Sequence, residues 1–306
     1  MDDVLSEIVL TGRDKDFGTR NVISTIFSGH CTGFDQTQVS TAVRLRQAHG
    51  ARPHAFYQLS EIGRFLLIST MVTQRIGRAI VFDLARAGWS VAVHYHHSAD
   101  EAQNLIKEVT DAGGEAVAVS ADLGIEEQAS ALLPAAEAAI GPIVCLINNA
   151  SVFGEDTTQT ATRNSWDLHM EVNLRAPFVL TQTFARQLPQ SRAGNVINIV
   201  DQRVWNLGAD YATYTLSKIG LWGLTQTTAR ALAPNIRVNA IGPGPTLPHS
   251  RQSEDGFVHH WRATPLGRQV TPEDICHGVR YILDATTMTG QMIALDAGEH
   301  LGGEHK

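Results

Sequence analysis

The chain contains the run Asn195-Val-Ile-Asn-Ile-Val-Asp201 and, after a short loop, the run Tyr214-Thr-Leu-Ser-Lys218. The first run predicts a buried strand that delivers Asp201 at its end, and the second predicts a helix with Tyr214 and Lys218 on one face. An ammonium group one helical turn from a phenol, helped by an oxidised nicotinamide, favours the phenolate and lowers the pKa of the tyrosine. The two runs are consistent with a tyrosine that gives a proton to a substrate as a hydride arrives, the alternative being an exposed lysine beside a half-buried tyrosine.

Short apolar strands alternate with helices on both sides of these runs. We expect strands at 65–68, 91–93, 116–119, 143–147, 196–200, 236–240 and 292–295. We expect helices near 76–87, 100–111, 126–139, 166–189, 211–233 and 272–284, the first of them ended by Gly88. This alternation is typical of an α/β fold with a parallel sheet of about seven strands and helices on both faces.

Length and composition fit one large domain with an added segment. The chain has 306 residues, of which 43% are hydrophobic, and no linker divides the part from residue 65 onward. We therefore expect one cofactor-binding domain, 65–306, that also contains the substrate site. Residues 1–64 show no sustained period, with possible strands only at 8–10 and 22–27, so they form an N-terminal extension of unassigned structure.

Charge and cysteine usage exclude several classes of protein. The formal net charge is −7, which argues against a nucleic-acid partner or an anionic membrane surface. The three cysteines are widely spaced and fit reduced thiols in a cytoplasm. The chain has no signal-peptide core and no apolar run of membrane-spanning length, so we expect a cytoplasmic protein. His30-Cys31 has no second pair at ligand spacing, and no metal site is expected.

Four ordered landmarks together resemble the short-chain dehydrogenase/reductase family over about residues 65–301. They are Asn148-Asn-Ala-Ser151, Asn173, Tyr214 with Lys218, and Pro243-Gly244. The resemblance implies a Rossmann-type, doubly wound fold, a nicotinamide cofactor and frequently a homo-tetramer. It also implies that Asn173 holds a water beside the lysine, the alternative being an ordinary mid-helix asparagine.

The turn after the first large strand, Ser69 to Arg78, resembles the family's dinucleotide turn, Thr-Gly-x-x-x-Gly-x-Gly. Thr70 and Gly77 match it, whereas Met71 stands at the first glycine and Arg75 at the second. The pteridine reductase branch carries arginine at the second position, where a guanidinium favours the ribose phosphate of NADPH. A residue other than glycine costs roughly 1 kcal/mol or more where φ must be positive, so Met71 is expected to weaken cofactor binding.

The end of the second large strand reads His94-Tyr-His-His97-Ser98 and resembles the His-Tyr-His-Arg-Ser segment of pteridine reductases. No carboxylate is present there to repel a 2′-phosphate, which again implies NADPH. The alternatives are solvated loop histidines and a Ser98 that caps the next helix. Asp122 resembles the family's adenine contact, although a helix-capping aspartate would look the same.

The resemblance thus assigns a set of residues to the cofactor. They are Thr70, Arg75, Ile76, Gly77, His94, His96, His97, Ser98, Asp122, Leu123, Asn149, Ala150, Ser151, Tyr214, Lys218, Pro243 and Gly244.

Asp201 narrows the substrate class. Most family members have serine there, whereas Asp201 lies 13 residues before Tyr214, as in the Asp-Tyr-Lys set of pteridine reductases. A carboxyl group can share a proton with the nitrogens of a heterocycle. Ser151 and Phe153 resemble the residues that contact and stack on a flat pterin, and Trp205 is expected to line the pocket. The alternatives are a strand-end Asp201 that caps a turn and a Phe153 that only packs the core.

We therefore predict NADPH-dependent reduction of a dihydropterin or dihydrofolate, with Asp201, Tyr214, Lys218 and Asn173 as the catalytic set. The polar loop 247–267 is long enough to be a substrate lid. Two alternatives stay open. One is a carbonyl reductase of the 3-oxoacyl thioester type, and the other is a non-catalytic NADP-binding regulatory protein. The expected partners are the small-molecule substrate and further copies of the chain.

Overall fold

The computed structural model describes residues 7–11, 22–26, 64–69, 76–248 and 252–302. Contacts divide the chain into one unit of Met1–Ile62 and a second of Gly63–Lys306. In the first unit β1 (Glu7–Thr11) and β2 (Val22–Ile26) pair antiparallel, with Glu7 opposite Ile26. Both strands fall where the sequence indicates a possible strand.

The second unit is built on a seven-stranded sheet in which every pairing is parallel. Its strands are β3 (Arg64–Ser69), β4 (Trp89–Tyr95), β5 (Glu115–Ser120), β6 (Cys145–Asn148), β7 (Gly194–Ile199), β8 (Ile236–Pro243) and β9 (Met292–Leu295). Their spatial order is β5-β4-β3-β6-β7-β8-β9. The predicted α/β, doubly wound, Rossmann-type sheet is confirmed. The order reverses between β3 and β6, which is the switch point where such sheets bind ligands.

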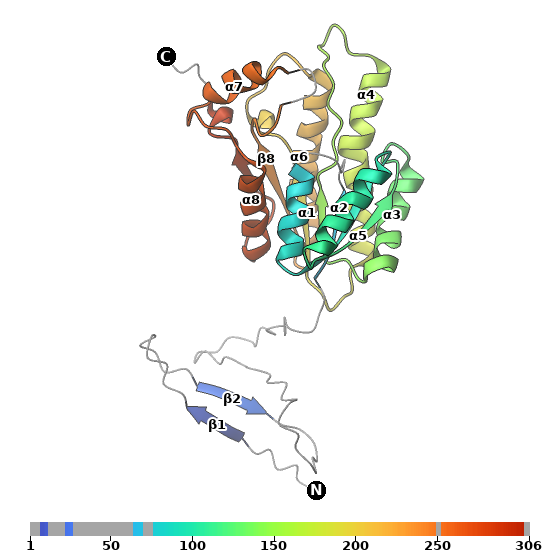
Figure 1. Cartoon of the computed structure of the whole chain (residues 1–306), viewed down its shortest axis with the longest axis vertical. Helices are drawn as coiled ribbons and strands as arrows, with labels where there is room; N and C mark the ends of the chain where they lie inside the picture. The colour runs from blue at the N-terminus through green and yellow to red at the C-terminus, as the bar shows by residue number, and fades with distance from the viewer. Residues whose placement is uncertain (1–6, 12–21, 27–63, 70–75, 249–251, 303–306) are drawn as a thin grey trace. The chain divides into compact units, whose positions relative to one another are not determined.

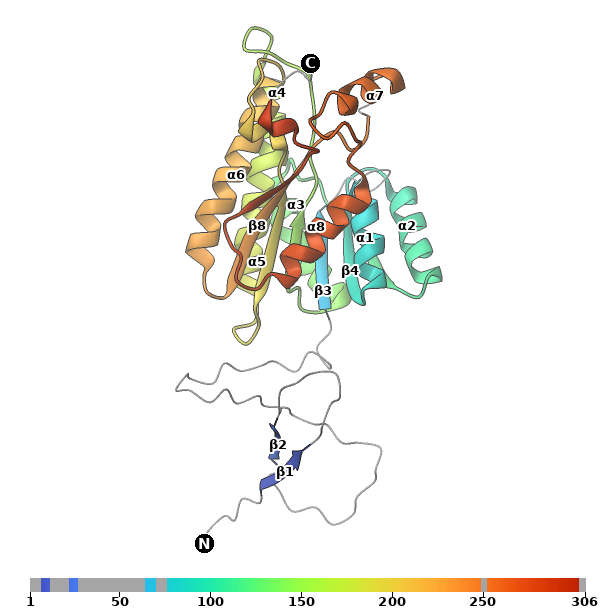
Figure 2. The same ribbon diagram turned by 90° about the vertical axis from the view of Figure 1, so that its left-hand side faces the viewer.

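Helices cover both faces of this sheet (Figures 1 and 2). On one face lie α1 (Ile76–Arg86), α2 (Ala99–Asp111) and α8 (Pro272–Asp284). On the other lie α3 (Glu126–Ile140), α5 (Ala176–Gln187) and α6 (Ala212–Leu232), with α4 (Arg163–Met170) beside α6. Within the described part of the chain, no helix has the length and apolar character needed to cross a membrane.

Alternate residues of each central strand enter opposite cores. Leu66 packs with the cluster under α1, α2 and α8, whereas Leu67 packs with the cluster under α3 and α5. Cys145 and Leu146 divide between the two clusters in the same way, and neither is exposed. Burial on both faces explains why the strands read as continuous apolar runs.

A buried polar chain joins β6, β7 and α6. The Asn148 side-chain amide donates to Asn198 Oδ1 at 2.8 Å, and the Asn198 amide donates to Thr225 Oγ1, also at 2.8 Å. Thr225 Oγ1 donates in turn to the Leu221 carbonyl oxygen at 2.9 Å. Asn148 and Asn198 are directly opposite each other in the sheet, so this chain fixes the register of β6 against β7.

Two predicted elements differ from the structure. The predicted helix 166–189 is α4, a π-helical turn η1 (Glu171–Arg175) and α5, and it begins at Arg163 because the Thr162 side chain caps the Ser165 N–H. The predicted loop 247–267 contains α7 (Glu254–Arg262), whose Gly256 N–H donates to Ser253 Oγ at 3.1 Å. The remaining predicted helices and strands are present within a few residues of their expected ends.

Arg237 on β8 holds the end of α8 against the sheet. Its guanidinium donates to the carbonyl oxygens of Ile282, Leu283, Ala285 and Met288 at 2.9 to 3.1 Å. Three of these oxygens belong to the last turn of α8 or the residue after it, where helical carbonyls lack intrahelical partners. Arg237 therefore acts as a C-terminal cap supplied from a neighbouring strand.

Replacing Arg237 with methionine is expected to lower the free energy of unfolding by about 2–4 kcal/mol, because a charge-assisted cap of several carbonyls is lost. Urea unfolding of Arg237→Met measures this. Arg230→Met removes an exposed arginine from the last turn of α6 and is the matched control, expected to stay within about 0.5 kcal/mol of the parent. Equal stability of the two variants would contradict the capping role.

Candidate active site

The candidate site lies at the carboxyl edge of the sheet, beside the switch point between β3 and β6. Asn149 to Phe153 follow β6, Asp201 follows β7, and Gly244 follows β8. The short helix η2 (Gln202–Trp205) and η3 (Glu299–Leu301) follow β7 and β9 at the same edge. Residues that are up to about 150 positions apart in the chain are therefore neighbours because parallel strands end together.

Tyr214 and Asp201 form a direct hydrogen bond. The phenol donates to Asp201 Oδ2 at 2.8 Å, while the Arg203 backbone N–H donates to Asp201 Oδ1, also at 2.8 Å. Lys218 Nζ donates to the Ile199 carbonyl oxygen at 3.0 Å and lies 5.7 Å from the centroid of the Tyr214 ring. Tyr214 and Lys218 are only 6% and 2% exposed. The structure thus brings together three of the four residues predicted to be catalytic, and Asp201 does more than cap a turn.

The protonation of this cluster is set mainly by burial. Burial raises the pKa of the Asp201 carboxyl, against the opposing effects of the Arg203 N–H, Tyr214 and Lys218. Burial and then the Asp201 carboxylate hold the pKa of Tyr214 well above its usual range. The sequence led us to expect a lowered tyrosine pKa; the direction in this structure is the opposite, because burial and Asp201 outweigh the opposing effects of Arg203 and Ser151. Tyr214 therefore keeps its proton and is a donor rather than a standing phenolate.

Lys218 has the opposite shift. Burial lowers the pKa of its ammonium to about 8, with Asp201 opposing the change. The lysine can therefore exchange a proton close to neutral pH, which suits a group that restores the proton of a neighbouring acid.

Asn173 connects the loop after β6 to helix α6. It is fully buried within the π-helical turn, where its Oδ1 accepts from the Val152 N–H at 2.8 Å. Its amide donates to the Val152 carbonyl oxygen at 3.0 Å and to Ser217 Oγ at 3.1 Å. Ser217 Oγ donates to the Tyr214 carbonyl oxygen at 2.6 Å. Asn173 is therefore no ordinary mid-helix asparagine, since it fixes Ser151 to Phe153 beside Tyr214; its expected water remains a prediction.

An aromatic wall leads outward from Tyr214. The Phe153 ring lies edge-on to Tyr214 with centroids 4.8 Å apart, and it stacks on Tyr211 at 4.7 Å. Phe153 is 42% exposed, so it does not simply pack the core. Trp205 is placed elsewhere, 5.4 Å from the His300 ring and 6.4 Å from the Trp222 ring, and the structure does not bring it to Phe153 or Tyr214.

A second buried network supports the start of α6. Thr213 Oγ1 donates to Asp156 Oδ2 at 2.5 Å, and the Thr213 N–H donates to Asp156 Oδ1 at 3.0 Å. Thr213 Oγ1 is also 2.6 Å from His169 Nδ1, and the His169 ring centroid lies 6.0 Å from that of Tyr214. Burial alone would raise the pKa of Asp156, but the hydrogen bonds from Thr213 and Ser165 outweigh it and keep that pKa below its usual range.

The ends of β4 and β5 hold the predicted adenosine contacts. His94 is 1% exposed with Nε2 2.8 Å from the Ala121 carbonyl oxygen, so its ring links β4 to the residue after β5; its cofactor contact stays a prediction. His96 Nε2 lies 3.4 Å from Asp122 Oδ2, and the exposed His97 ring lies against His96. Asp122 closes its own turn by accepting from the Gly124 N–H at 2.8 Å.

The other predicted cofactor residues lie along the same edge. Ser98 is the N-cap residue just before α2 and makes no side-chain capping bond, so the alternative in which its side chain caps this helix is wrong. Ile76 begins α1, and Gly77, Leu123 and Ala150 are buried. Asn149, Ser151, Pro243 and Gly244 are half-buried. A Cβ on Gly244 would lie 2.5 Å from Asp296 Cα, so only glycine fits there. Thr70, Met71 and Arg75 lie outside the described residues.

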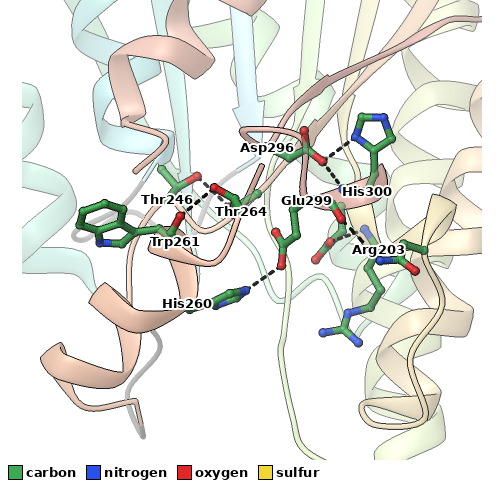
Figure 3. A network of polar contacts seen from close by, with 11 residues as sticks. Arg203, Thr246, His260, Trp261, Thr264, Asp296, Glu299 and His300 are labelled. Carbon is green, nitrogen blue, oxygen red and sulfur yellow. Dashed lines mark hydrogen bonds and ion pairs between the residues drawn. The ribbon is translucent and has the colours of Figure 1, made fainter. Parts of the chain in front are cut away.

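The sequence did not predict a polar cluster formed by His260, Glu299, Asp296 and His300, which is shown in Figure 3. His260 of α7 has Nε2 2.6 Å from Glu299 Oε1, and this hydrogen bond is the main reason that the pKa of His260 is raised. His300 Nδ1 lies 2.7 Å from Asp296 Oδ2. The run Ser253-Glu-Asp255 is the helix-start signal that could have revealed α7, whereas nothing in the sequence pairs His260 with Glu299.

No group of three or more His, Cys, Asp or Glu side chains within the described ranges could hold a metal ion. Cys145 and Cys276 are buried thiols, and Cys31 lies outside the described ranges.

Known proteins resemble this chain over most of its length. A family model described as Enoyl-(Acyl carrier protein) reductase matches residues 72–300. The chain is 29% identical over 237 residues to 3-oxoacyl-(acyl-carrier-protein) reductase of Staphylococcus epidermidis, a match that covers 76% of this chain and 97% of that protein.

Solved structures give stronger matches. FolM alternative dihydrofolate reductase 1 of Brucella canis, solved with NADP, is 44% identical with a TM-score of 0.76, covering 78% of this chain and 95% of that one. A short-chain dehydrogenase/reductase of Serratia marcescens is 31% identical with a TM-score of 0.72, covering 77% and 97%.

Replacing Lys218 with methionine is expected to stabilise the protein at pH 7 by on the order of 2 kcal/mol, because a buried charge is removed. The folded lysine has a pKa of about 8 against 10.5 for the unfolded one, so the unfolded chain binds more protons between these pH values. The gain in stability from Lys218→Met should therefore shrink as the pH rises through that interval. Urea unfolding at pH 7 and pH 10 measures it, with exposed Lys107→Met as the control that shows no such gain. A destabilised Lys218→Met at pH 7 would overturn the expectation.

Replacing Thr213 with valine is expected to destabilise the protein by about 1–3 kcal/mol near pH 7, because the buried Asp156 carboxylate loses a hydrogen bond. Asp156 has a lowered folded pKa, so its stabilisation is present above the unfolded value and is lost as pH falls through the folded one. The difference in free energy of unfolding between the parent and Thr213→Val should therefore become smaller as the pH falls. Unfolding measured from pH 7 to pH 3 checks this, and Thr213→Ser should retain the parent's profile.

Proposed function

The chain belongs to the short-chain dehydrogenase/reductase family, and from that membership we propose that it is an NADPH-dependent reductase of a dihydropterin or a dihydrofolate. One observation carries the substrate class: the carboxyl group of Asp201 occupies the strand end beside Tyr214 and accepts its phenol hydrogen bond at 2.8 Å. The name of the Brucella relative, an alternative dihydrofolate reductase solved with NADP, supports the same choice.

The edge of the sheet fits a dinucleotide cofactor. Helix α1 begins at Ile76 beyond the carboxyl end of β3, so its positive end faces the switch point. Two further residues lie along the same edge. Gly244 approaches Asp296 closely, and Asn149 is half-buried. His96 and His97 follow β4 without a carboxylate in that segment, which favours a 2′-phosphate. When bound there, NADPH supplies the hydride.

The residues of the chain supply the proton. Tyr214 keeps its proton because burial and Asp201 raise its pKa, and it can give that proton to a C=N nitrogen of the substrate. Asp201 can share a proton with the neighbouring ring nitrogens, since burial raises its own pKa. Lys218, with a pKa of about 8, can return a proton to Tyr214 after turnover. Phe153, which is 42% exposed, places an aromatic ring beside Tyr214 where a planar heterocycle would bind.

Carbonyl reduction is the second candidate. The matches to a 3-oxoacyl-(acyl-carrier-protein) reductase and to the Enoyl-(Acyl carrier protein) reductase model favour it. A ketone, however, needs a single hydrogen-bond donor at its oxygen, and a buried carboxyl group suits a donor-rich heterocycle better.

We also infer that the chain forms a homo-oligomer. Among the described strands, β9 is an edge strand whose one partner is β8. Open edges of this kind favour a further copy of the chain.

Purified protein is expected to oxidise NADPH with a dihydropterin or dihydrofolate and not with an acetoacetyl thioester. Tyr214→Phe should lose about 10²- to 10⁴-fold in kcat because the proton donor is gone, and Asp201→Ser should lose at least tenfold on pterins. The absorbance of NADPH measures each rate. Tyr281→Phe, which removes an exposed phenol from α8, is the matched control and should keep the parent rate.

Each of the other possible results would favour a different conclusion about the function. Turnover of the thioester that tolerates Asp201→Ser would assign carbonyl reduction. Tight NADPH binding without turnover of any substrate would assign a regulatory role. Failure to bind NADPH would indicate that Met71 disables the dinucleotide turn.

A further inference from the structure

Arg203 places a cation at the outer end of the candidate site. Its backbone N–H holds Asp201 Oδ1, so the residue is fixed two positions beyond the proposed proton-sharing carboxyl group. Its side chain turns outward, with the guanidinium carbon 4.9 Å from the centroid of the Tyr211 ring. The charge of Arg203 also reaches Tyr214 and His260, where it opposes the rise in both pKa values without reversing it. The guanidinium therefore lies at the mouth of the site.

The Tyr211 ring links this cation to the proton donor. Arg203 lies over Tyr211, Tyr211 stacks on Phe153 at 4.7 Å, and Phe153 meets the edge of Tyr214 at 4.8 Å. Tyr211 has the left-handed backbone values φ 60 and ψ 45, which are unfavourable for a residue other than glycine. The backbone is therefore strained at Tyr211, the residue whose ring lies against the Arg203 guanidinium.

The guanidinium has little else to bind. Its one hydrogen bond within the described residues is to the Asp210 carbonyl oxygen at 3.5 Å, and no carboxylate there forms an ion pair with it. Two acidic groups that share a neighbour with Arg203 have other partners: Glu299 pairs with His260, and Glu155 accepts from the Tyr211 phenol at 3.5 Å. Most of its donors thus remain available to a ligand.

We propose that Arg203, oriented by Tyr211, binds a carboxylate of the substrate and makes this chain select folates over pterins that lack a carboxylate. The proposal rests on the proposed function and deepens it. A dihydrofolate has a heterocycle, an aromatic linker and a glutamate in that order. With its heterocycle at Asp201 and Tyr214, the linker runs along Phe153 and Tyr211, and the glutamate reaches the guanidinium. A planar guanidinium binds a carboxylate through two parallel hydrogen bonds, which a neutral side chain cannot reproduce.

The test compares substrates with and without the glutamate. Arg203→Met should raise the KM for 7,8-dihydrofolate by roughly ten- to hundredfold, while the KM for 7,8-dihydrobiopterin changes by less than about twofold. Added salt should raise the dihydrofolate KM of the parent and not that of Arg203→Met. Arg230→Met, which removes the same charge from the exposed end of α6, should resemble the parent in all three measurements.

A binding measurement separates this proposal from the proposed function. Calorimetry with N-(4-aminobenzoyl)glutamate, which has the linker and the glutamate but no heterocycle, should detect binding to the parent and roughly tenfold weaker binding to Arg203→Met. If neither pterin nor folate is turned over but this fragment still requires Arg203, the reductase function fails and the carboxylate subsite stands. Equal fragment affinity in parent and variant, or equal loss on both substrates, would overturn the subsite and leave Arg203 as support for Asp201.

Discussion

The buried hydrogen bond from Tyr214 to Asp201 is the interaction on which the rest of the site depends. A phenol and a carboxyl group are stable in an apolar interior only if each satisfies the other, and the 2.8 Å contact does so. Every neighbouring feature keeps that contact in place. The Arg203 N–H holds the second carboxyl oxygen, Ser217 and Asn173 tie the backbone of Tyr214 to the loop after β6, and Thr213 anchors the start of the helix.

The sequence predicted the fold well because burial on both faces of a parallel sheet leaves continuous apolar runs of strand length. It also predicted that Asp201, Tyr214 and Lys218 meet, since strand ends and helix faces are periodic. It did not predict the direction of the tyrosine pKa, which depends on how deeply the pair is buried. His94 is a second example. Its position near the end of a strand can be predicted from the sequence, whereas its hydrogen bond to the Ala121 carbonyl oxygen depends on how the neighbouring segments pack.

Contacts between distant segments were the other part that the sequence could not supply. Tyr211 and Phe153 are 58 positions apart in the chain and stack only because the loop after β6 meets the start of α6. His260 and Glu299 meet in the same way across α7 and η3. No local period encodes such pairs. The stacking of Phe153 on Tyr211 and the pairing of His260 with Glu299 could therefore be found only in the structure.

The buried chain from Asn148 through Asn198 to Thr225 has an evolutionary consequence. Each member satisfies the next, so replacing one by an apolar residue leaves a neighbouring amide or hydroxyl unpaired in a water-free interior. An ancestor that changed one position alone would have passed through a less stable intermediate. We therefore expect lineages that depart from this pattern to have exchanged all three positions, together with the strand register they fix.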